Sequence, residues 1–148
     1  MKELINKLVT ELLETLSNSP DKDRYLLGIT GCPAAGKSML AGKLTDEINF
    51  RTGDDLAAVV PMDGFHLPNS ILKKRGLTKV KGAPETFDAG SFVELINQLY
   101  EFPDRSIMCP AYDRKIHDPV ENFITIKPGN RLIIVEGNYL LLNAHPWN

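Results

Sequence analysis

Residues 31–38 read Gly31-Cys32-Pro33-Ala34-Ala35-Gly36-Lys37-Ser38 and match the phosphate-binding pattern G-x-x-x-x-G-K-[S/T] at every fixed position. The glycines at positions 31 and 36 permit backbone conformations and a close approach that a β-carbon would block. The N–H groups of such a loop point inward and attract an anion, and the positive end of a following helix adds to that attraction. The stretch therefore predicts a site for the phosphates of a nucleoside triphosphate.

The segments on either side of this loop predict the strand and the helix that the motif needs. Residues 25–30 form a short apolar run, which is typical of a buried parallel strand. Residues 37–50 carry Leu40, Leu44 and Ile48 on one face of a predicted helix. A chance match to the pattern would lack this strand–loop–helix context.

The loop and the start of the following helix contain side chains with expected roles in nucleotide binding and catalysis. Lys37 supplies a mobile positive charge for the outer phosphates and counts as a catalytic residue. Ser38 offers a hydroxyl to Mg²⁺. Contacts to the nucleotide are expected from Gly31 through Met39. Cys32 is interpreted as the occupant of a permissive position, although nearby N–H groups could also lower the pKa of its thiol.

Composition favours a single cytoplasmic domain. The chain has 148 residues, of which 43% are hydrophobic and 24% charged, and its net charge is −2. This balance does not suggest nucleic acid or an anionic membrane as a partner, and the basic run of residues 73–75 is interpreted as a solvated helix end. The two cysteines have no metal-ligand spacing, which fits a reducing compartment. No signal-peptide pattern and no long apolar run are present.

Periodicity predicts alternating strands and helices. An amphipathic helix is expected over residues 2–17, and residues 1–22 are assigned to this helix and a linker before a core of residues 23–148. The remaining expected elements are strands over 57–62, 107–109, 123–126 and 132–135, helices over 68–75 and 90–101, the latter capped by Ser91, and a turn over 127–130. We expect one α/β domain in three layers, a P-loop NTPase fold with a mostly parallel sheet.

Two carboxylates follow predicted strands, where ligands of such sheets bind. Asp63 comes directly after the second strand and could accept a hydroxyl proton or hold Mg²⁺, and the alternative is that it caps the next helix. Glu136 follows the apolar residues 132–135, where a carboxylate without a partner would be costly, so a place beside Mg²⁺ is expected. For His66 a contact to substrate and a hydrogen-bonding role near the site both stay open.

Five segments together resemble the phosphoribulokinase/uridine kinase family of P-loop kinases, which phosphorylate a hydroxyl of a small metabolite. They occur in the family's order and comprise residues 31–38, 61–66 (Pro-Met-Asp-Gly-Phe-His), 81–88 (Lys-Gly-Ala-Pro-Glu-Thr-Phe-Asp), 110–119 (Pro-Ala-Tyr-Asp-Arg-Lys-Ile-His-Asp-Pro) and 135–141 (Val-Glu-Gly-Asn-Tyr-Leu-Leu). The sequence looks most similar to a branch whose members are called pantothenate-kinase-like or fructose-transport-associated.

The resemblance implies roles for single residues and for cofactors. Asp63 matches the family's base for the attacking hydroxyl, and Asp88 an acid that binds sugar-type hydroxyls. Tyr112 and His117 match residues of the acceptor pocket, and Glu136 the acid near Mg²⁺. The alternatives are a helix cap for Asp88, a core position for Tyr112 and a surface turn for His117. ATP and Mg²⁺ are the implied cofactors, and a nucleoside, pantothenate or a sugar the implied acceptor.

The family pattern usually continues for several dozen residues beyond the last segment and includes a lid with arginines. The chain is therefore expected to be truncated at its C-terminus relative to the family, which leaves two hypotheses. One is a working small-molecule kinase, and the other is a nucleotide-binding module without catalysis. A nucleic-acid-dependent ATPase is disfavoured because Glu136 precedes Gly137, which favours transfer over hydrolysis. Association into homo-oligomers stays open.

Overall fold

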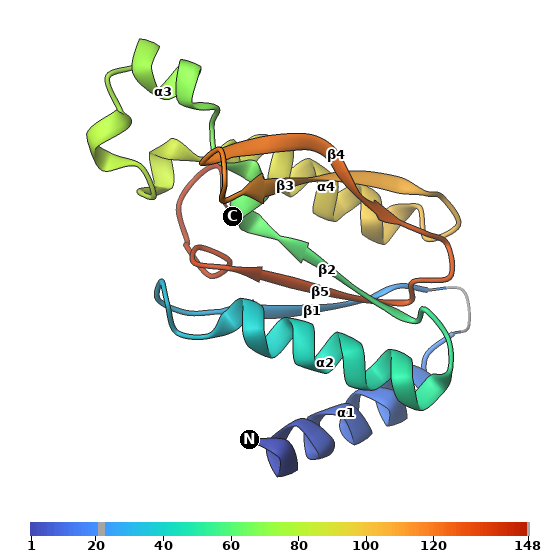
Figure 1. Cartoon of the computed structure of the whole chain (residues 1–148). Coiled ribbons are helices and arrows are strands. Elements are labelled where there is room, and N and C mark those ends of the chain that lie inside the picture. The colour runs from blue at the N-terminus through green and yellow to red at the C-terminus, as the bar shows by residue number, and fades with distance from the viewer. Residues whose placement is uncertain (21–22, 148) are drawn as a thin grey trace.

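A three-stranded parallel sheet forms the middle layer of the computed structural model, which describes residues 1–20 and 23–147 (Figure 1). The strand order is β1 (Tyr25–Thr30), β5 (Leu132–Gly137), β2 (Ala57–Pro61). β5 lies in the centre and all of its residues are buried, as its continuous apolar run predicts. The carboxyl ends of the three strands therefore meet at one edge. Part of the expected linker, residues 21–22, lies outside the described residues.

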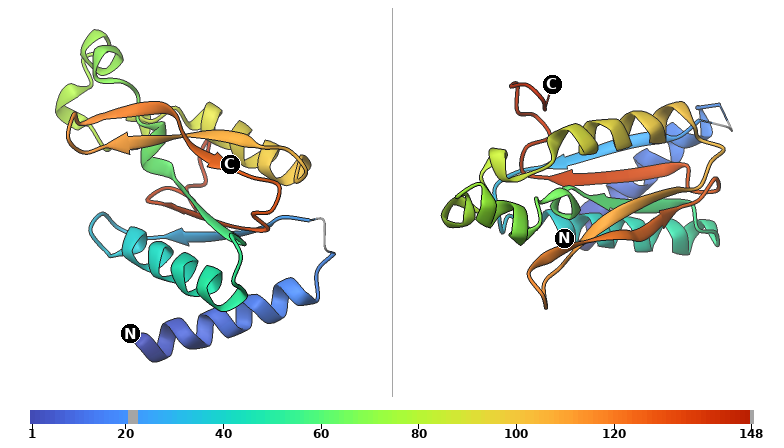
Figure 2. Two further views of the ribbon diagram at one scale, coloured as in Figure 1. Left: turned by 45° about the vertical axis from the view of Figure 1, so that its right-hand side comes forward. Right: turned by 90° about the horizontal axis from the view of Figure 1, so that it is seen from above.

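Helices cover both faces of this sheet, which confirms the predicted three layers. Leu132 and Ile134 of β5 point into a core with α1 (Lys2–Ser17) and α2 (Lys37–Thr52). Ile133 and Val135 point the opposite way, into a core shared with α4 (Ala89–Glu101) and a β-hairpin. The period-two alternation of β5 thus supplies both cores. Figure 2 shows α2 on one side of the sheet and α4 with the hairpin on the other.

The hairpin consists of β3 (Ile107–Asp113) and β4 (Asp118–Ile126), which pair antiparallel as a second sheet. The predicted strands over 107–109 and 123–126 are therefore the far ends of two longer strands and lie outside the parallel sheet. Pro110 interrupts the pairing register, and polar residues fill the half of β4 nearer the turn, so neither strand reads as a continuous apolar run.

Short helices connect β2 to α4. The strand predicted over 57–62 ends at Pro61 and continues as η1 (Met62–Phe65), and the helix predicted over 68–75 is α3 (Asn69–Lys74). Two further 3₁₀ turns, η2 (Thr78–Val80) and η3 (Pro84–Thr86), follow.

The predicted N-cap of the last helix was wrong. α4 begins at Ala89, and the cap is Asp88, whose carboxylate accepts hydrogen bonds from the Ser91 N–H at 3.1 Å and from its hydroxyl at 2.7 Å.

Two glycines allow elements around the sheet edge to approach closely. A β-carbon on Gly64 of η1 would clash with the carbonyl group of Pro110 in β3. A β-carbon on Gly137 at the end of β5 would lie 2.6 Å from the β-carbon of Met62. Both contacts fix the position of η1, which lies between β5 and the hairpin.

Arg24 joins the parts of the fold at the opposite end of the sheet. Its guanidinium group is buried and donates hydrogen bonds of 2.9–3.3 Å to backbone carbonyls only, those of Leu99, Phe102, Arg105, Lys127 and Asn130. Burial lowers the pKa of this guanidinium. The contacts satisfy carbonyls at the C-terminal end of α4, where a positive charge also complements the helix dipole.

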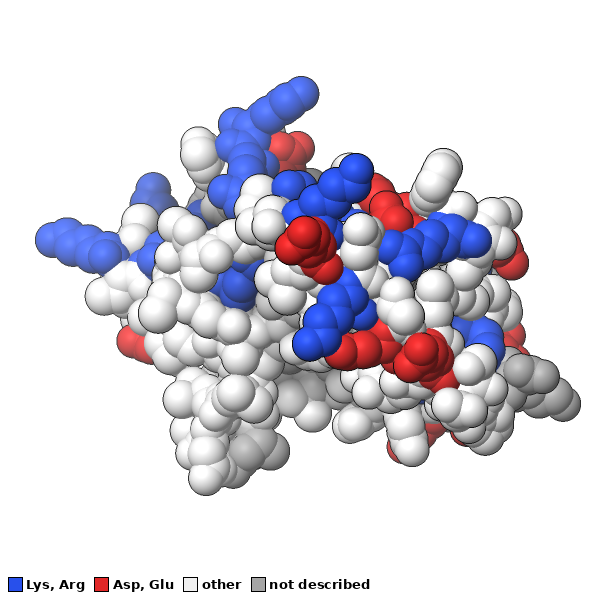
Figure 3. Space-filling model, turned by 90° about the horizontal axis from the view of Figure 1, so that it is seen from below, with Lys and Arg blue, Asp and Glu red and all other residues white. Residues whose placement is uncertain are grey.

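The face formed by α1 and α2 carries Lys and Arg side chains among Asp and Glu, and much of the rest is uncharged (Figure 3). Ion pairs on these helices include Lys7 with Glu11 at 4.0 Å and Arg51 with Glu47 at 2.7 Å. Within the described part of the chain, no helix combines the length and the apolar character needed to cross a membrane. Both cysteines are free thiols, Cys32 exposed and Cys109 buried.

Candidate active site

The predicted phosphate loop runs from the end of β1 to the start of α2. Gly36 has φ = 88° and forms the N-cap of α2, and Ala34 adopts φ = 61°, a strained conformation for a residue with a β-carbon. Lys37 folds back over the loop, where its Nζ donates to the carbonyl oxygen of Cys32 at 2.9 Å. The helix N-terminus, the loop and the lysine therefore converge on one point, as an anion site requires.

The loop and both strand-end carboxylates line one cavity of about 380 Å³. Glu136 at the end of β5 accepts a hydrogen bond from the Ser38 hydroxyl at 3.0 Å, across 98 residues of sequence. Asp63 reaches the same cavity from η1. The lining also includes the predicted loop residues Pro33, Ala34, Gly36, Lys37 and Met39. The structure thus brings together the groups predicted for phosphates, metal and base.

Burial dominates the electrostatics of Glu136. The residue is 5% exposed, and loss of solvent raises the pKa of its carboxyl group. The hydrogen bond from Ser38 opposes this shift, while the nearby negative charge of Asp63 adds to it, and the positive charges of Lys37 and Arg114 lower the pKa. The ionised form of Glu136 is therefore costly in this cavity, and a bound cation would lower that cost.

These residues fit a magnesium ion that also binds a nucleotide. Two carboxylates and one hydroxyl are hard oxygen donors, and Mg²⁺ commonly takes only one or two carboxylates, with water and phosphate oxygens completing its coordination. Among the residues that the structure describes, no group of three or more His, Cys, Asp and Glu is arranged to hold a metal by itself. Ser38, Asp63 and Glu136 could hold Mg²⁺ only together with such further ligands.

Two residues of this cavity had no predicted role. Arg114 enters it from the turn between β3 and β4, and Asn138 follows Glu136 and Gly137 after β5. Both stand inside segments that carry the family resemblance, so their position was visible in the sequence. Their place in this cavity was not visible in the sequence, because it depends on how the segments that carry them pack beside the loop.

The residues predicted for the acceptor gather around His66. Its ring lies 4.9 Å from that of Tyr112 and 4.1 Å from that of Phe87, measured between centroids. Its Nδ1 lies 2.8 Å from the carbonyl oxygen of Asp63. The hydrogen-bonding alternative for His66 is therefore present in the structure, and its ring also stands in contact with a predicted acceptor residue.

The turn between β3 and β4 is tied to the segment after η1. Lys81 places its Nζ 5.2 Å from the centroid of the Tyr112 ring and donates to the backbone carbonyl of His117 at 2.7 Å. Asn69 also donates to that carbonyl, at 2.8 Å. His117 lies in an exposed turn with φ = 53°, so it occupies the surface turn that was its alternative, while Tyr112 is only partly buried.

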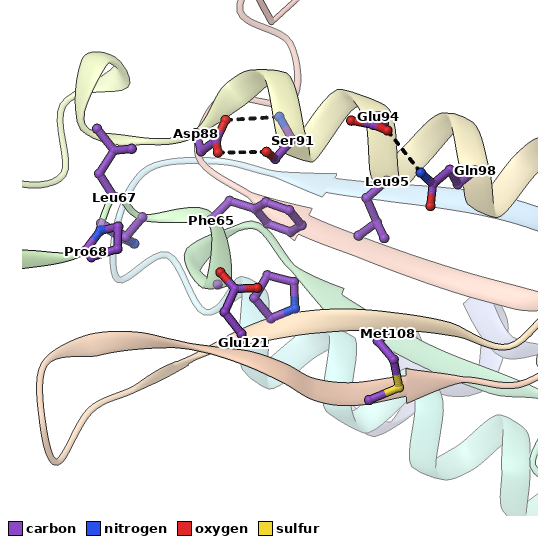
Figure 4. Close-up of a pocket in the computed structure, with 13 residues that line it drawn as sticks. Phe65, Leu67, Pro68, Asp88, Ser91, Glu94, Leu95, Gln98, Met108 and Glu121 are labelled. Atoms are coloured by element: carbon purple, nitrogen blue, oxygen red, sulfur yellow. Dashed lines mark hydrogen bonds between the residues drawn. The ribbon is translucent and has the colours of Figure 1, made fainter. Parts of the chain in front are cut away.

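A second cavity of about 300 Å³ lies between α4 and the hairpin (Figure 4). His66 and Asp88 line it, and so do the carboxylates of Glu94 and Glu121. Asp88 caps α4 through its hydrogen bonds with Ser91 and also lines this cavity. The helix cap and the position in a candidate acceptor cavity, given as alternatives above, therefore occur together. Tyr112 and His117 are not part of its lining, so the four predicted acceptor residues do not share one cavity.

The fold is that of the P-loop kinases. The chain belongs to the phosphoribulokinase/uridine kinase family, as shown by its 38% identity to a protein of Silicibacter sp. TM1040 described as a candidate fructose transport system kinase. The structures agree with a TM-score of 0.84 over 97% of this chain and 68% of that one. No protein-family model matches the chain.

Two curated relatives point the same way. A protein of Schizosaccharomyces pombe named as a candidate uridine kinase is 39% identical over 99% of this chain, and the chain spans 61% of its length. A pantothenate kinase of Sodalis glossinidius is 32% identical over 84% of this chain and 39% of its own length. Relatives are thus named as kinases of different small metabolites.

Proposed function

We propose that the protein transfers the γ-phosphoryl group of ATP to a hydroxyl group of a small metabolite, with Mg²⁺ as cofactor. The observation that carries the proposal is the cavity in which Lys37, Ser38, Asp63 and Glu136 meet at the carboxyl edge of the sheet. Kinase names among the relatives support the class of reaction. The cytoplasm, where ATP is available, is the proposed location.

The nucleotide side would act by positioning and charge. The N–H groups of the loop would hold the β-phosphate, and Lys37 would leave the Cys32 carbonyl to contact the outer phosphates. Ser38 and Glu136 would hold Mg²⁺, whose positive charge would offset the negative charge of the phosphates. Phosphoryl transfer needs little covalent chemistry from the protein, so these groups account for most of the expected acceleration.

Asp63 would act on the acceptor. It belongs to η1, lines the phosphate cavity, and its carbonyl oxygen lies 2.8 Å from Nδ1 of His66. A carboxylate in this place can accept the proton of the attacking hydroxyl as the oxygen approaches phosphorus. His66 and Tyr112 would then contact the body of the acceptor.

The charge around the second cavity supports an uncharged acceptor. Its lining has carboxylates from Asp88, Glu94 and Glu121, and no Lys or Arg among the described residues. Carboxylates bind pairs of hydroxyls well and repel anions. A nucleoside or a free sugar therefore fits better than pantothenate, glycerate or a sugar phosphate.

Measuring ADP release tests both the proposed kinase activity and the proposed uncharged acceptor. The chain is incubated with Mg·ATP and single acceptors, nucleosides and free sugars against pantothenate and glycerate, each compared with a blank without acceptor. We expect release above the blank with one uncharged acceptor. ATP binding without any acceptor-dependent release would instead identify a nucleotide-binding module and contradict the kinase proposal, and release with only an anionic acceptor would contradict the acceptor class.

Asp63→Asn tests the base. The variant should bind Mg·ATP with little change and lose about 10²–10⁴-fold in kcat, the usual contribution of a general base. Asp46→Asn is the matched control, because Asp46 is exposed on α2 and outside the site. Intact turnover in Asp63→Asn would show that Asp63 is not the base.

A further inference from the structure

The phosphate cavity has cations from two separate elements of the fold. Lys37 and Arg114 are the only Lys and Arg among the described residues that line it, together with the carboxylates of Asp63 and Glu136. Lys37 belongs to the loop that holds the phosphates, whereas Arg114 arrives from the turn of the hairpin. A phosphoryl group in transfer carries charge on three equatorial oxygens, and a donor on the loop alone cannot reach all of them.

The backbone that carries Arg114 is anchored. Arg114 is the first residue of the turn after β3, and the Asp113 carboxylate accepts a hydrogen bond from the Lys115 N–H at 2.7 Å. At the other end of the turn, the Asp118 carboxylate accepts from the Asn69 N–H at 2.8 Å.

The hairpin itself stands against η1, which carries Asp63. Because the missing side chain of Gly64 lets β3 approach the backbone of η1, the turn holds a defined position relative to Asp63.

The side chain of Arg114, by contrast, has no bonding partner among the described residues. It is exposed and makes no hydrogen bond or ion pair with any described residue. It nevertheless lines the same cavity as the carboxylates of Asp63 and Glu136. A cation whose backbone is held and whose donors are unused is arranged for a ligand with negative charge.

We propose that Arg114 contacts the phosphoryl group during transfer, as an arginine supplied by the hairpin within the same chain. This inference rests on the proposed function and adds the group that stabilises the transferring phosphate. The planar guanidinium group presents donors in a fork that matches two phosphate oxygens, which a lysine cannot do. The same hairpin carries Tyr112, so the acceptor and the arginine would be placed by one element.

The neighbouring cation provides a matched control. Lys115 is also exposed on the turn and shares a cavity beside Val120 and Phe123 with Arg114, but it does not line the phosphate cavity. Arg114→Met and Lys115→Met each remove one positive charge from the same turn. Arg114→Lys keeps the charge and removes the fork.

The test uses the intact chain and binding of ADP with and without aluminium fluoride, which mimics a phosphoryl group in transfer. We expect fluoride to tighten Mg·ADP binding in the unsubstituted chain and in Lys115→Met. Arg114→Met should lose this tightening while its affinity for ADP alone is unchanged, and Arg114→Lys should recover only part of it. An absence of tightening in the unsubstituted chain, or tightening that survives in Arg114→Met, would overturn the proposal.

Turnover gives a second readout once an acceptor is found. Arg114→Met should lower kcat by about 10²–10³-fold with little change in the dissociation constant of ATP, the usual cost of removing one preorganised donor. A loss confined to ATP binding would contradict a contact in the transition state. If no acceptor supports turnover, the proposed function fails, and the fluoride measurement still decides the place of Arg114.

Discussion

The phosphate side and the acceptor side of the site are built in opposite ways. The phosphate side is one continuous segment, residues 31–38, between a strand and a helix that touch it in sequence. The acceptor side takes His66 from the residue after η1, Asp88 from the start of α4, and Tyr112 and His117 from the hairpin. Asp63 links the two sides, because its carboxylate lines the phosphate cavity and its carbonyl oxygen lies 2.8 Å from Nδ1 of His66.

This difference has a physical cause. A cradle of backbone N–H groups needs only local torsions, so a motif of eight residues can encode it. An acceptor pocket must match one molecule in shape, so it is assembled from distant segments whose approach depends on packing, such as the contact of Gly64 with Pro110. The two sides should therefore fail separately, and the following changes test whether they do.

Lys37→Met should have the largest effect and act on the phosphate side alone. Loss of the mobile cation is expected to lower kcat by about 10²–10³-fold, because its charge is used in the transition state. Stability should change little, since Lys37 has only one hydrogen bond, to the Cys32 carbonyl. ADP release and urea unfolding measure the two quantities. Lys43→Met, exposed on α2, is the control, and an equal loss there would contradict a local role.

Gly64→Ala should disturb the acceptor side alone. The added methyl group meets the Pro110 carbonyl, so the hairpin must shift, and overpacking of this kind costs about 1–3 kcal/mol of unfolding free energy. Acceptor-dependent turnover should fall while the affinity for Mg·ATP is kept.

Gly42→Ala is the matched change for Gly64→Ala. Its methyl group meets nothing within 4 Å on α2, so a gain of about 0.5–1 kcal/mol is expected from helix propensity. Equal loss of ATP binding and turnover in Gly64→Ala would show that the two sides are not separable.

Glu136→Gln should stabilise the metal-free protein at neutral pH. Burial raises the pKa of Glu136 in the folded state above its value in the unfolded chain, so its ionised form costs stability. This penalty is fully present above the folded pKa and disappears as the pH falls through that pKa toward the ordinary glutamate value. The stability difference between variant and unsubstituted chain should shrink over the same range.

Urea unfolding in a chelating buffer at several pH values measures this difference, and a pH-independent difference would contradict the assignment. Mg²⁺ should reverse the order, because the variant loses a carboxylate ligand. Turnover of the variant should also fall.

The smallest effects are expected at the two cysteines, one in the phosphate loop and one in the hairpin. Cys32 is exposed in the phosphate loop, whereas Cys109 is buried in β3, and burial raises the pKa of its thiol to about 11. A thiol reagent should therefore modify one cysteine in the native protein and both after unfolding. Mg·ATP should slow the first reaction. Cys32→Ser should leave turnover nearly unchanged, and a large loss would give this position a role beyond a permissive one.

The expected elements that were confirmed are those with strong local signals. The strand at Tyr25–Thr30, the helix that follows it and β5 were predicted within a few residues, because apolar periodicity and the glycine pattern act over short distances. The hairpin was predicted only in part, since most residues of its two strands are partly buried or exposed and each strand contains a proline. Arg24 carried no signal at all, because its carbonyl partners come from two distant segments, residues 99–105 and 127–130.

The sequence by itself determined the phosphate loop, the three layers and the two strand-end carboxylates, because each depends on neighbours in the chain or on the rule that parallel strands end at one edge. Only the tertiary structure decided that Ser38 bonds Glu136, that Asp88 caps α4 and that Arg114 faces the phosphate cavity. Ser38 and Glu136 are far apart in sequence, and Arg114 reaches the cavity only through the packing of the hairpin against η1, whereas the local Asp88 cap was one of two open alternatives that the packing of α4 settled.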